Sequence, residues 1–200
     1  MASGMTYTMT ETSQLSTAEY YGKALCELGA EHKDVVALTA DLAKSTKIGM
    51  FGEKFPDRFF NVGIAEQNMF GVAAGLAKNG LIPFASTFAI FASARSLDQV
   101  HTDICYQNVP VKIIATHAGT SFGQAGSTHH SLIDMTCMRV LPHMTVICPC
   151  DGAETYHAVK AAYETPGPVY IRINRGFDQI IYKNLEDCSF EVGKAKVMNE

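Results

Sequence analysis

The chain has 200 residues, of which 47% are hydrophobic and 18% are charged, a composition typical of a single globular domain with a sizeable core. Its formal net charge of −4, without a cluster of Lys and Arg, excludes the basic surface that nucleic-acid-binding proteins present. Its longest apolar stretches are too short to cross a bilayer, and the first residues lack the pattern of a secretion signal. We therefore expect a cytoplasmic protein that binds neither nucleic acid nor a membrane.

The six cysteines are scattered along the chain and do not follow the spacing of a disulfide framework. The closest pair, Cys148 and Cys150, flanks a single proline and lacks both the two-residue spacer and the second pair of a zinc site. We therefore expect no metal site in this chain and interpret the cysteines as reduced thiols of the core. They are Cys26, Cys105, Cys137, Cys148, Cys150 and Cys188.

The first predicted element follows a polar segment, which we expect to be a flexible leader over residues 1–15. Ser16 or Thr17 is a suitable N-cap for a helix over 17–31, whose apolar side chains recur at helical spacing. A nearly continuous apolar run follows at 35–39, as is typical of a strand that is buried on both faces. The domain therefore opens with a helix and a buried strand.

The same alternation of apolar runs and helical periodicity continues along the chain. Strands that alternate with helices of this length predict right-handed crossovers and a mostly parallel sheet. We expect a three-layer α/β domain over 16–184, followed by a linker over 185–200 toward a C-terminal domain that this chain lacks. Further strands are predicted at 59–62, 84–88, 111–116, 144–148 and 169–173, and further helices at 65–79, 90–106, 130–138 and 152–164.

Glu66 stands out among the residues that follow the predicted strands, where an open parallel sheet collects its ligands. It lies in the first turn of the predicted helix over 65–79, which is otherwise largely apolar. One interpretation is that its carboxylate complements the helix dipole. The other is a functional role, because a carboxylate beside a buried helix needs a specific partner. The residue pattern alone leaves both interpretations open.

A second cluster, at 117–130, is rich in glycine and histidine. Its glycines permit tight turns, but they match neither phosphate-loop fingerprint, which argues against an independent nucleotide site. Three histidines flank the glycines, among them His117 and His129, and their side chains can hydrogen-bond sugars or phosphates. Each histidine alone is typical of a surface or core position, whereas three at one rim indicate a binding site.

Six short segments, spread over most of the chain, form a recognisable series when they are taken together. They are Asp41–Thr46, Phe60–Asn68, Thr87–Phe91, Ala115–His117, Gly126–His129 and Asn174–Gly176. In this order and spacing they resemble the pyrimidine-binding domain of transketolase, and the resemblance covers about residues 16–195. The Gly-Ile-Ala-Glu-Gln stretch at 63–67 is also similar to 1-deoxyxylulose-5-phosphate synthase, a relative in the same superfamily.

The resemblance implies a thiamine-diphosphate-binding fold and an active site shared between two chains. A separate subunit with a pyrophosphate domain would hold the diphosphate and its metal, Mg²⁺ or Ca²⁺, while this domain would receive the aminopyrimidine ring and form a homodimer. Glu66 would donate a proton to ring nitrogen N1′ and so favour the imino tautomer that activates the cofactor. Phe88 and Phe91, which alone are typical of core packing, would pack on the ring, and Asp41 and Ile64 would also contact the cofactor.

The resemblance also assigns substrate contacts. His117 and His129 match histidines that contact substrate hydroxyls and assist proton movement, so they join Glu66 as candidate catalytic residues. Ser45 and Arg175 match positions that bind the phosphate of a sugar phosphate, where a guanidinium fork suits the phosphate oxygens.

Three positions depart from the family pattern. Ala18 or a neighbour stands where the family has a phosphate-binding arginine, and Ala94 stands where it has a third aromatic residue of the ring pocket. Ala125 replaces an aspartate that is expected to bind the hydroxyl of the acceptor. These changes leave the predicted fold and cofactor intact, and they leave the substrate open.

The sequence thus predicts one subunit of a transketolase-like enzyme, which transfers a two-carbon ketol unit between sugar phosphates or related sugars and is active only with its partner. One alternative is a fragment of 1-deoxyxylulose-5-phosphate synthase or of the β subunit of a 2-oxoacid dehydrogenase. Another is a non-catalytic dimerisation module, against which the retained Glu66, Phe88 and His129 argue.

Overall fold

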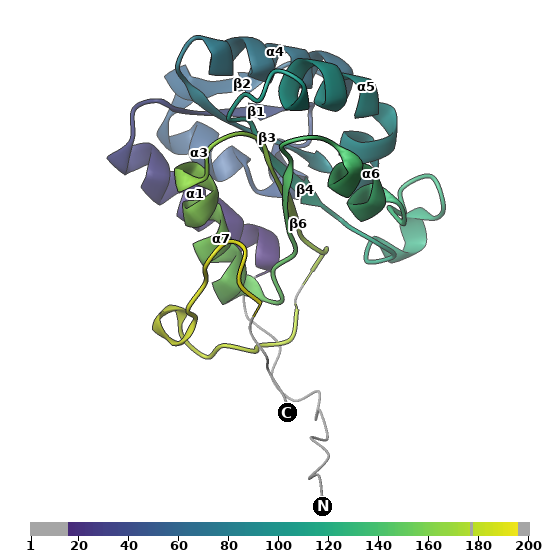
Figure 1. Cartoon of the computed structure of the whole chain (residues 1–200). Coiled ribbons are helices and arrows are strands. Elements are labelled where there is room, and N and C mark those ends of the chain that lie inside the picture. The colour runs from purple at the N-terminus through teal and green to yellow at the C-terminus, as the bar shows by residue number, and fades with distance from the viewer. Residues whose placement is uncertain (1–15, 177, 196–200) are drawn as a thin grey trace, which may run out of the picture.

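The computed structural model describes residues 16–176 and 178–195, and in this part of the chain it contains one six-stranded sheet (Figure 1). The strands are β1 (Val35–Thr39), β2 (Phe59–Asn61), β3 (Ile82–Phe88), β4 (Lys112–Thr116), β5 (Thr145–Ile147) and β6 (Val169–Arg172). They run parallel in the order β2-β1-β3-β4-β6-β5, which confirms the predicted α/β class with a parallel sheet. The leader predicted over 1–15 lies outside the described residues.

The central strands of the sheet are buried on both faces, whereas the edge strands β2 and β5 are partly exposed, and this explains why the central strands read as continuous apolar runs. All five residues of β1 are buried, and successive side chains point to opposite faces. Val35 and Ala37 contribute to one hydrophobic core, and Val36 and Leu38 contribute to the other. One strand therefore supplies both cores.

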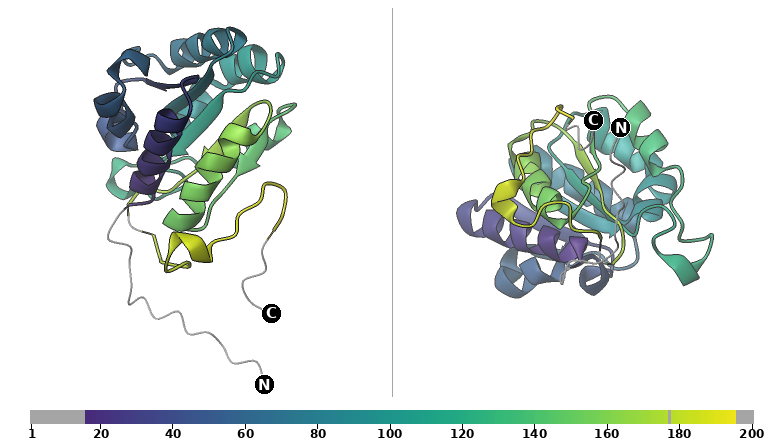
Figure 2. Two further views of the ribbon diagram at one scale, coloured as in Figure 1. Left: turned by 90° about the vertical axis from the view of Figure 1, so that its left-hand side faces the viewer. Right: turned by 90° about the horizontal axis from the view of Figure 1, so that it is seen from below.

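Helices cover both faces and complete three layers. On one face, α1 (Thr17–Glu31) and α7 (Gly152–Glu164) lie side by side, as Figure 2 shows. The other face is covered by α4 (Glu66–Lys78), by α6 (Asp134–Val140) and by the helical segment between β3 and β4. The three-layer arrangement predicted from the sequence is confirmed.

Ser16 caps α1 and fixes where the helix begins. Its backbone N–H and its hydroxyl both donate to the carboxylate of Glu19, at 2.7 and 2.9 Å. Thr17 is the first helical residue, so Ser16 is the N-cap of the two candidates. Ala24 and Leu25 on the inner face of the helix are fully buried, as the helical spacing predicted.

The helix predicted over 90–106 is divided into three segments. The π-helical segments η2 (Phe91–Arg95) and η3 (Val100–Cys105) flank one turn of α-helix, α5 (Leu97–Gln99). A π turn holds more residues than an α turn, so it rotates the side chains that follow it around the helix axis. Apolar periodicity does not reveal this rotation. The rotation nevertheless decides which residues of η2 face the ends of the strands.

Two short helices between β1 and β2 were not predicted, because neither is long enough to show a helical period. They are α2 (Ala43–Thr46) and α3 (Gly49–Lys54). The helix predicted at 130–138 begins later, at Asp134, because Ser131 pairs with Gly119 in an isolated β-bridge. The 3₁₀ turns are η1 (Pro56–Arg58), η4 (Gly123–Ala125) and η5 (Leu185–Asp187).

The cysteines are not all core residues. Cys26 and Cys105 are buried free thiols, as predicted, but Cys148 and Cys150 are exposed. The core interpretation is therefore wrong for the second pair, because the chain leaves the short edge strand β5 at Ile147 and turns outward. Among the described residues, no group of three or more His, Cys, Asp or Glu side chains is placed to hold a metal ion.

The segment after β6 packs back onto the domain. Cys188 and Tyr182 form a small cluster with Ala153 of α7, and Phe190 and Val192 pack against the core beneath α1 and α7. Whether 185–200 serves as a linker to a further domain stays a prediction. Within the described part of the chain, no helix is both long enough and apolar enough to cross a membrane.

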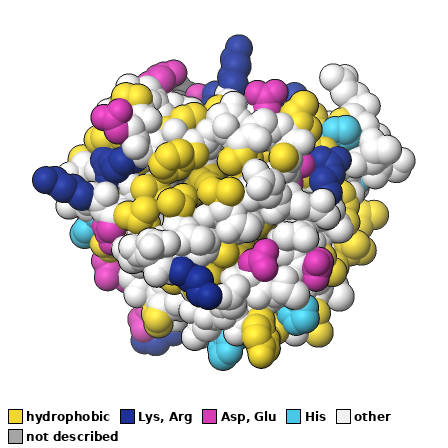
Figure 3. Space-filling view, turned by 90° about the horizontal axis from the view of Figure 1, so that it is seen from above, with side chains coloured by type: hydrophobic (Ala, Val, Ile, Leu, Met, Phe, Trp, Pro, Cys, Tyr) yellow, Lys and Arg dark blue, Asp and Glu magenta, His cyan; other side chains and the backbone are white. Residues whose placement is uncertain are grey.

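One face of the molecule carries exposed apolar side chains. Figure 3 views the side that α4 and α5 form in Figure 1, and apolar side chains gather near its centre. Val72 on α4 is 37% exposed, and Ile64, just before this helix, is 79% exposed. Apolar residues gathered in this way indicate a surface that another molecule covers.

Candidate active site

The loops that follow the parallel strands reach one edge of the sheet, and the predicted site residues lie there. Asp41 follows β1, Glu66 follows β2 and Phe91 follows β3. His117 and Arg175 follow β4 and β6. Two pockets open at this edge, so the arrangement obeys the general rule for ligand sites of open α/β sheets.

Three residues at this edge have a left-handed backbone, which side chains other than glycine seldom adopt. The φ angles are 60° at Asp41, 64° at Lys47 and 59° at His117. Such conformations cost energy and cluster at functional sites, where the surrounding structure holds them in place. Their position independently marks the carboxyl ends of β1 and β4 as a site.

The first pocket, which we call the Glu66 pocket, has a volume of about 410 Å³. It is lined by Ala40, Asp41, Leu42, Ile64, Glu66, Phe91, Arg95, Thr128 and His129. Five predicted site residues therefore meet here: Asp41, Ile64, Glu66, Phe91 and His129. The pocket combines apolar walls with a carboxylate, which suits a flat ring that carries a hydrogen-bonding nitrogen.

Glu66 opens α4 and is almost completely buried, with 2% of its surface exposed. Its carboxylate lies at the positive end of the helix dipole and interacts favourably with it, as one of the two interpretations of the sequence expected. In the described part of the chain, no side chain caps this helix, and the carboxylate makes an ion pair with Arg95, Nη1 to Oε2 at 2.9 Å. A guanidinium thus lies beside this buried carboxylate and donates a hydrogen bond to it, a partner that the helix pattern did not predict.

The predicted aromatic pair divides between the pocket and the core. Phe91 lines the Glu66 pocket, whereas Phe88 is 5% exposed and lies behind it, with the ring centroids 5.6 Å apart. The ring of Phe88 also packs at a tilt against His117, centroid to centroid at 4.1 Å, and Phe122 lies 5.1 Å away. Phe88 thus packs against both Phe91 and His117 from the core side, and it lies between the two pockets.

The two predicted catalytic histidines have different surroundings. His117 is buried, and its Nδ1 lies 2.8 Å from the hydroxyl of Thr116. Burial, together with the nearby charge of Arg175, lowers the pKa of His117 to about 4, so its imidazole is neutral at pH 7. His129 lies at the rim, with Nδ1 2.9 Å from the hydroxyl of Thr128. A neutral imidazole can both accept and donate hydrogen bonds to hydroxyl groups.

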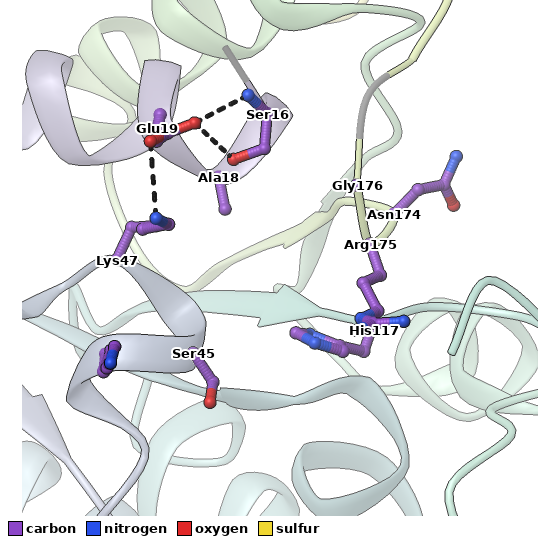
Figure 4. Close-up of a pocket in the computed structure, with 10 residues that line it drawn as sticks. Ser16, Ala18, Glu19, Ser45, Lys47, His117, Asn174, Arg175 and Gly176 are labelled. Carbon is purple, nitrogen blue, oxygen red and sulfur yellow. Dashed lines mark hydrogen bonds and ion pairs between the residues drawn. The ribbon is translucent and has the colours of Figure 1, made fainter. Parts of the chain in front are cut away.

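The second pocket, which we call the Arg175 pocket, has a volume of about 420 Å³ (Figure 4). It is lined by Ser16, Ala18, Glu19, Lys44, Ser45, Lys47, His117, Asn174, Arg175 and Gly176. Three predicted substrate residues, Ser45, His117 and Arg175, therefore meet here. In Figure 4, Lys47 makes an ion pair with Glu19 at 3.3 Å on one side, and Arg175 lies on the other. With three cations and one carboxylate, the pocket favours an anion.

Sequence reasoning missed Lys44, Lys47 and Arg95. The two lysines lie within and just after a segment that carried the family resemblance, so a signal for them was present. Arg95 had no such signal, because it reaches Glu66 only through the π turn of η2. His130, one of the three clustered histidines, lines neither pocket, and its Nε2 lies 3.0 Å from the carbonyl oxygen of Gly123.

The fold and its pockets define a three-layer α/β domain that binds ligands at the carboxyl ends of a parallel sheet. Residues 13–177 match the family described as the pyrimidine binding domain of transketolase. The chain therefore belongs to this family, as the sequence segments indicated.

Individual relatives agree with this assignment. The chain is 46% identical over 178 residues to a putative transketolase C-terminal section of Methanocaldococcus jannaschii, covering 89% of this chain and 56% of the relative. It is 38% identical over 186 residues to one of the subunits of the apulose-4-phosphate transketolase of Phocaeicola vulgatus, covering 93% and 59%. A solved structure described as a split gene transketolase, inactive beta4 tetramer, superposes with a TM-score of 0.81 at 49% identity and covers 94% and 60%. The chain thus spans less than two thirds of the length of these relatives.

Proposed function

We propose that the chain is the pyrimidine-binding subunit of a transketolase-like enzyme. It transfers a two-carbon ketol unit between sugar phosphates or related sugars with thiamine diphosphate, and it acts only with a separate subunit that supplies the pyrophosphate domain. The observation that carries this proposal is the buried Glu66 carboxylate at the Glu66 pocket, beside the ring of Phe91.

The residues of the Glu66 pocket fit an aminopyrimidine ring. Ile64 and Phe91 offer apolar surface for the faces of a flat ring, and the carboxylate of Glu66 offers one strong hydrogen-bonding partner. The family matched is the pyrimidine-binding domain, so we assign the diphosphate and its Mg²⁺ or Ca²⁺ to the partner subunit. When bound, the cofactor supplies the nucleophilic carbon that carries the ketol unit.

The chain's own contribution is to hold a proton and to orient the reactants. Glu66 would hold a proton at ring nitrogen N1′. Because its carboxyl group is buried, it would also keep the ring in a fixed place. The neutral imidazole of His117 and the rim imidazole of His129 would hydrogen-bond the substrate hydroxyls and move protons between them. The buried position of His117 also keeps bulk water away from its side of the site.

The Arg175 pocket supports a phosphorylated substrate. Arg175 provides a guanidinium fork, Ser45 provides a hydroxyl, and Lys44 and Lys47 add positive charge where the family's arginine is replaced near Ala18. The relative from P. vulgatus is part of an apulose-4-phosphate transketolase, which is consistent with a sugar phosphate as ligand. The donor and the acceptor sugar stay open.

The exposed face of α4 supports assembly with other chains, both as a homodimer through this domain and with the pyrophosphate subunit. Among the described residues, an added Cβ at Gly75 would meet nothing within 4 Å, and one at Gly71 would meet only the Asp103 carboxylate at 3.7 Å. The fold of this chain therefore does not require glycine at either position. Together with the exposed side chain of Val72, they form a surface that another backbone can approach closely.

The experiment that tests this function is reconstitution. The chain is mixed with the pyrophosphate subunit from the same organism, thiamine diphosphate and Mg²⁺, and a panel of ketose donors and aldose acceptors is assayed for products two carbons longer and shorter. We expect transfer with both subunits and none with either subunit alone. A reconstituted complex that binds the cofactor and transfers no ketol unit in any pairing would contradict the proposal.

A further inference from the structure

Arg95 lies in the Glu66 pocket and contacts both groups that we assign to the cofactor ring. Its Nη1 is 2.9 Å from Oε2 of Glu66, and its guanidinium carbon is 3.9 Å from the centroid of the Phe91 ring. The cation thus makes an ion pair with the carboxylate and stacks on the aromatic wall at the same time. Both partners line the same pocket as the guanidinium itself.

The guanidinium group shares the chemistry of an aminopyrimidine. It is planar, it presents N–H donors in its plane, and it stacks well on aromatic faces. An aminopyrimidine in this pocket would use the same carboxylate for its hydrogen bond and the same ring for its stacking contact. The two groups therefore compete, because one carboxylate oxygen and one aromatic face cannot serve both in the same geometry.

We propose that Arg95 is an internal occupant of the pyrimidine pocket, which holds Glu66 and Phe91 in the free subunit and is displaced when the cofactor ring binds. The proposal rests on the function proposed above, and it goes beyond that function by making Arg95 a residue that sets cofactor affinity. The apparent affinity for the ring is lowered in proportion to the fraction of chains in which the guanidinium occupies the pocket.

The surroundings of Arg95 allow this exchange. Its side chain is 46% exposed, whereas Glu66 is 2% exposed, so the guanidinium can leave toward solvent while the carboxylate stays in place. Its backbone is anchored separately, because its carbonyl oxygen accepts a hydrogen bond from Nε2 of Gln67 at 3.1 Å. Among the described residues, the guanidinium donates one hydrogen bond, the bond to Glu66. Releasing the side chain therefore breaks one ion pair and one stacking contact.

Until it is displaced, Arg95 would also protect the subunit. A buried carboxylate without a partner is costly, and the ion pair offsets that cost before the cofactor arrives. A merely structural ion pair would have the same effect on folding. The two roles differ in one respect: removing a competitor tightens ring binding, whereas removing a structural support weakens it or leaves it unchanged.

The test measures binding of 4-amino-2,5-dimethylpyrimidine, the ring of the cofactor without its thiazolium and diphosphate, to the full chain by NMR titration. We expect Arg95→Met to bind this probe about fivefold to tenfold more tightly than the wild type, which corresponds to the loss of one partly exposed ion pair and one cation–π contact. Arg139→Met removes the same charge from an exposed position on α6 and should bind like the wild type.

Two further measurements complete the test. In the wild type, the side-chain Nε–Hε resonance of Arg95 should shift and sharpen as the probe saturates, and this readout does not depend on how well the variant folds. Weaker or unchanged binding by a folded Arg95→Met, or an unmoved Arg95 resonance at saturation, would overturn the proposal. Glu66→Gln should abolish probe binding whether position 95 is arginine or methionine. If Glu66→Gln binds the probe like the wild type, the proposed pyrimidine site itself is wrong.

Discussion

His117 illustrates how burial prepares a single residue for its proposed role. Its ring packs at a tilt against Phe88 and is hydrogen-bonded to Thr116, and its backbone is left-handed. Because burial disfavours the imidazolium, the ring keeps a lone pair for hydrogen bonding at neutral pH. The neighbouring Arg175 adds to this effect, so the same cation that would bind a phosphate also keeps His117 neutral.

The lowered pKa of His117 makes stability depend on pH. The pKa of His117 is about 4 in the folded chain, whereas an unperturbed histidine, as in the unfolded chain, has a pKa of 6.5. Between pH 4 and 6.5 the unfolded chain therefore binds the proton more tightly than the folded chain. The stabilisation is complete above pH 6.5 and is lost as the pH falls toward 4, on the order of 3 kcal/mol in all. Urea unfolding measured from pH 7 to 4 gives the loss of unfolding free energy on acidification. We expect this loss to be smaller in His117→Gln by the contribution of His117.

His101→Gln is the matched control, because it makes the same substitution at an exposed histidine. If His117→Gln lost as much unfolding free energy between pH 6.5 and 4 as the wild type, the buried, neutral imidazole would be the wrong description.

The sequence indicated which residues gather at the site better than it indicated their contacts. Glu66 and His117 were found from two signals: each lies shortly after a predicted strand, where parallel strands bring their carboxyl ends to one edge, and each lies in a segment that carries the family resemblance. Arg95 and Lys47 were not found, because long charged side chains reach partners that only the tertiary structure brings near. The ion pair at Glu66 therefore could not be derived from the helix pattern.

At the scale of elements, α4 carries both the proposed catalytic residue and the proposed contact surface. Its first residue is the buried Glu66, and its exposed face carries Gly75 and Val72. Placing both on one rigid helix fixes the distance between the carboxylate and any chain that docks on the exposed face. Assembly would then position the cofactor ring relative to Glu66.

Two glycine substitutions separate folding from assembly. Gly75→Ala should raise the unfolding free energy of the dilute chain by about 0.5–1 kcal/mol, because alanine favours the helix interior and no atom of residues 16–176 or 178–195 opposes the added methyl. The same change should weaken association with other chains, as measured by sedimentation. Gly75→Ala that assembles like the wild type would rule out close packing on this face.

Gly29→Ala in α1 is the matched comparison. An added Cβ there would lie 2.4 Å from a ring carbon of Phe51 and 2.8 Å from one of Phe55, so the helix could not keep its place. We expect it to lower the unfolding free energy by about 1–3 kcal/mol, the usual cost of overpacking a core.

The strands were the best predicted elements, because burial on both faces leaves an unbroken apolar run such as 35–39. The helices were predicted where they span several turns, as at 17–31. Prediction was poorer at 43–54, where two helices are too short for a period, and at 91–105, where π turns replace the expected α-helix. In both places the hydrogen bonding depends on the packing around the site rather than on local apolar spacing.

At the scale of the whole molecule, the proposed function makes this chain one half of an active site that two chains share. The Glu66 and Arg175 pockets lie at one edge of the sheet, joined by the rings of Phe88 and His117, so a cofactor ring and a sugar phosphate could be held side by side. The proposed diphosphate and metal belong to another chain, and the exposed surface of α4 offers a place for it. If the proposal holds, folding of this domain and assembly of the active site are separate events.

The most direct test of this account is the rate of ketol transfer by the reconstituted complex when Glu66→Gln replaces the wild-type chain. The amide keeps the size of the side chain but cannot hold the acidic proton, so we expect a loss of about 100-fold or more with the fold retained. Glu53→Gln, which removes an exposed carboxylate from α3, should transfer at the wild-type rate. A Glu66→Gln complex that binds thiamine diphosphate and transfers as fast as the wild type would contradict the account.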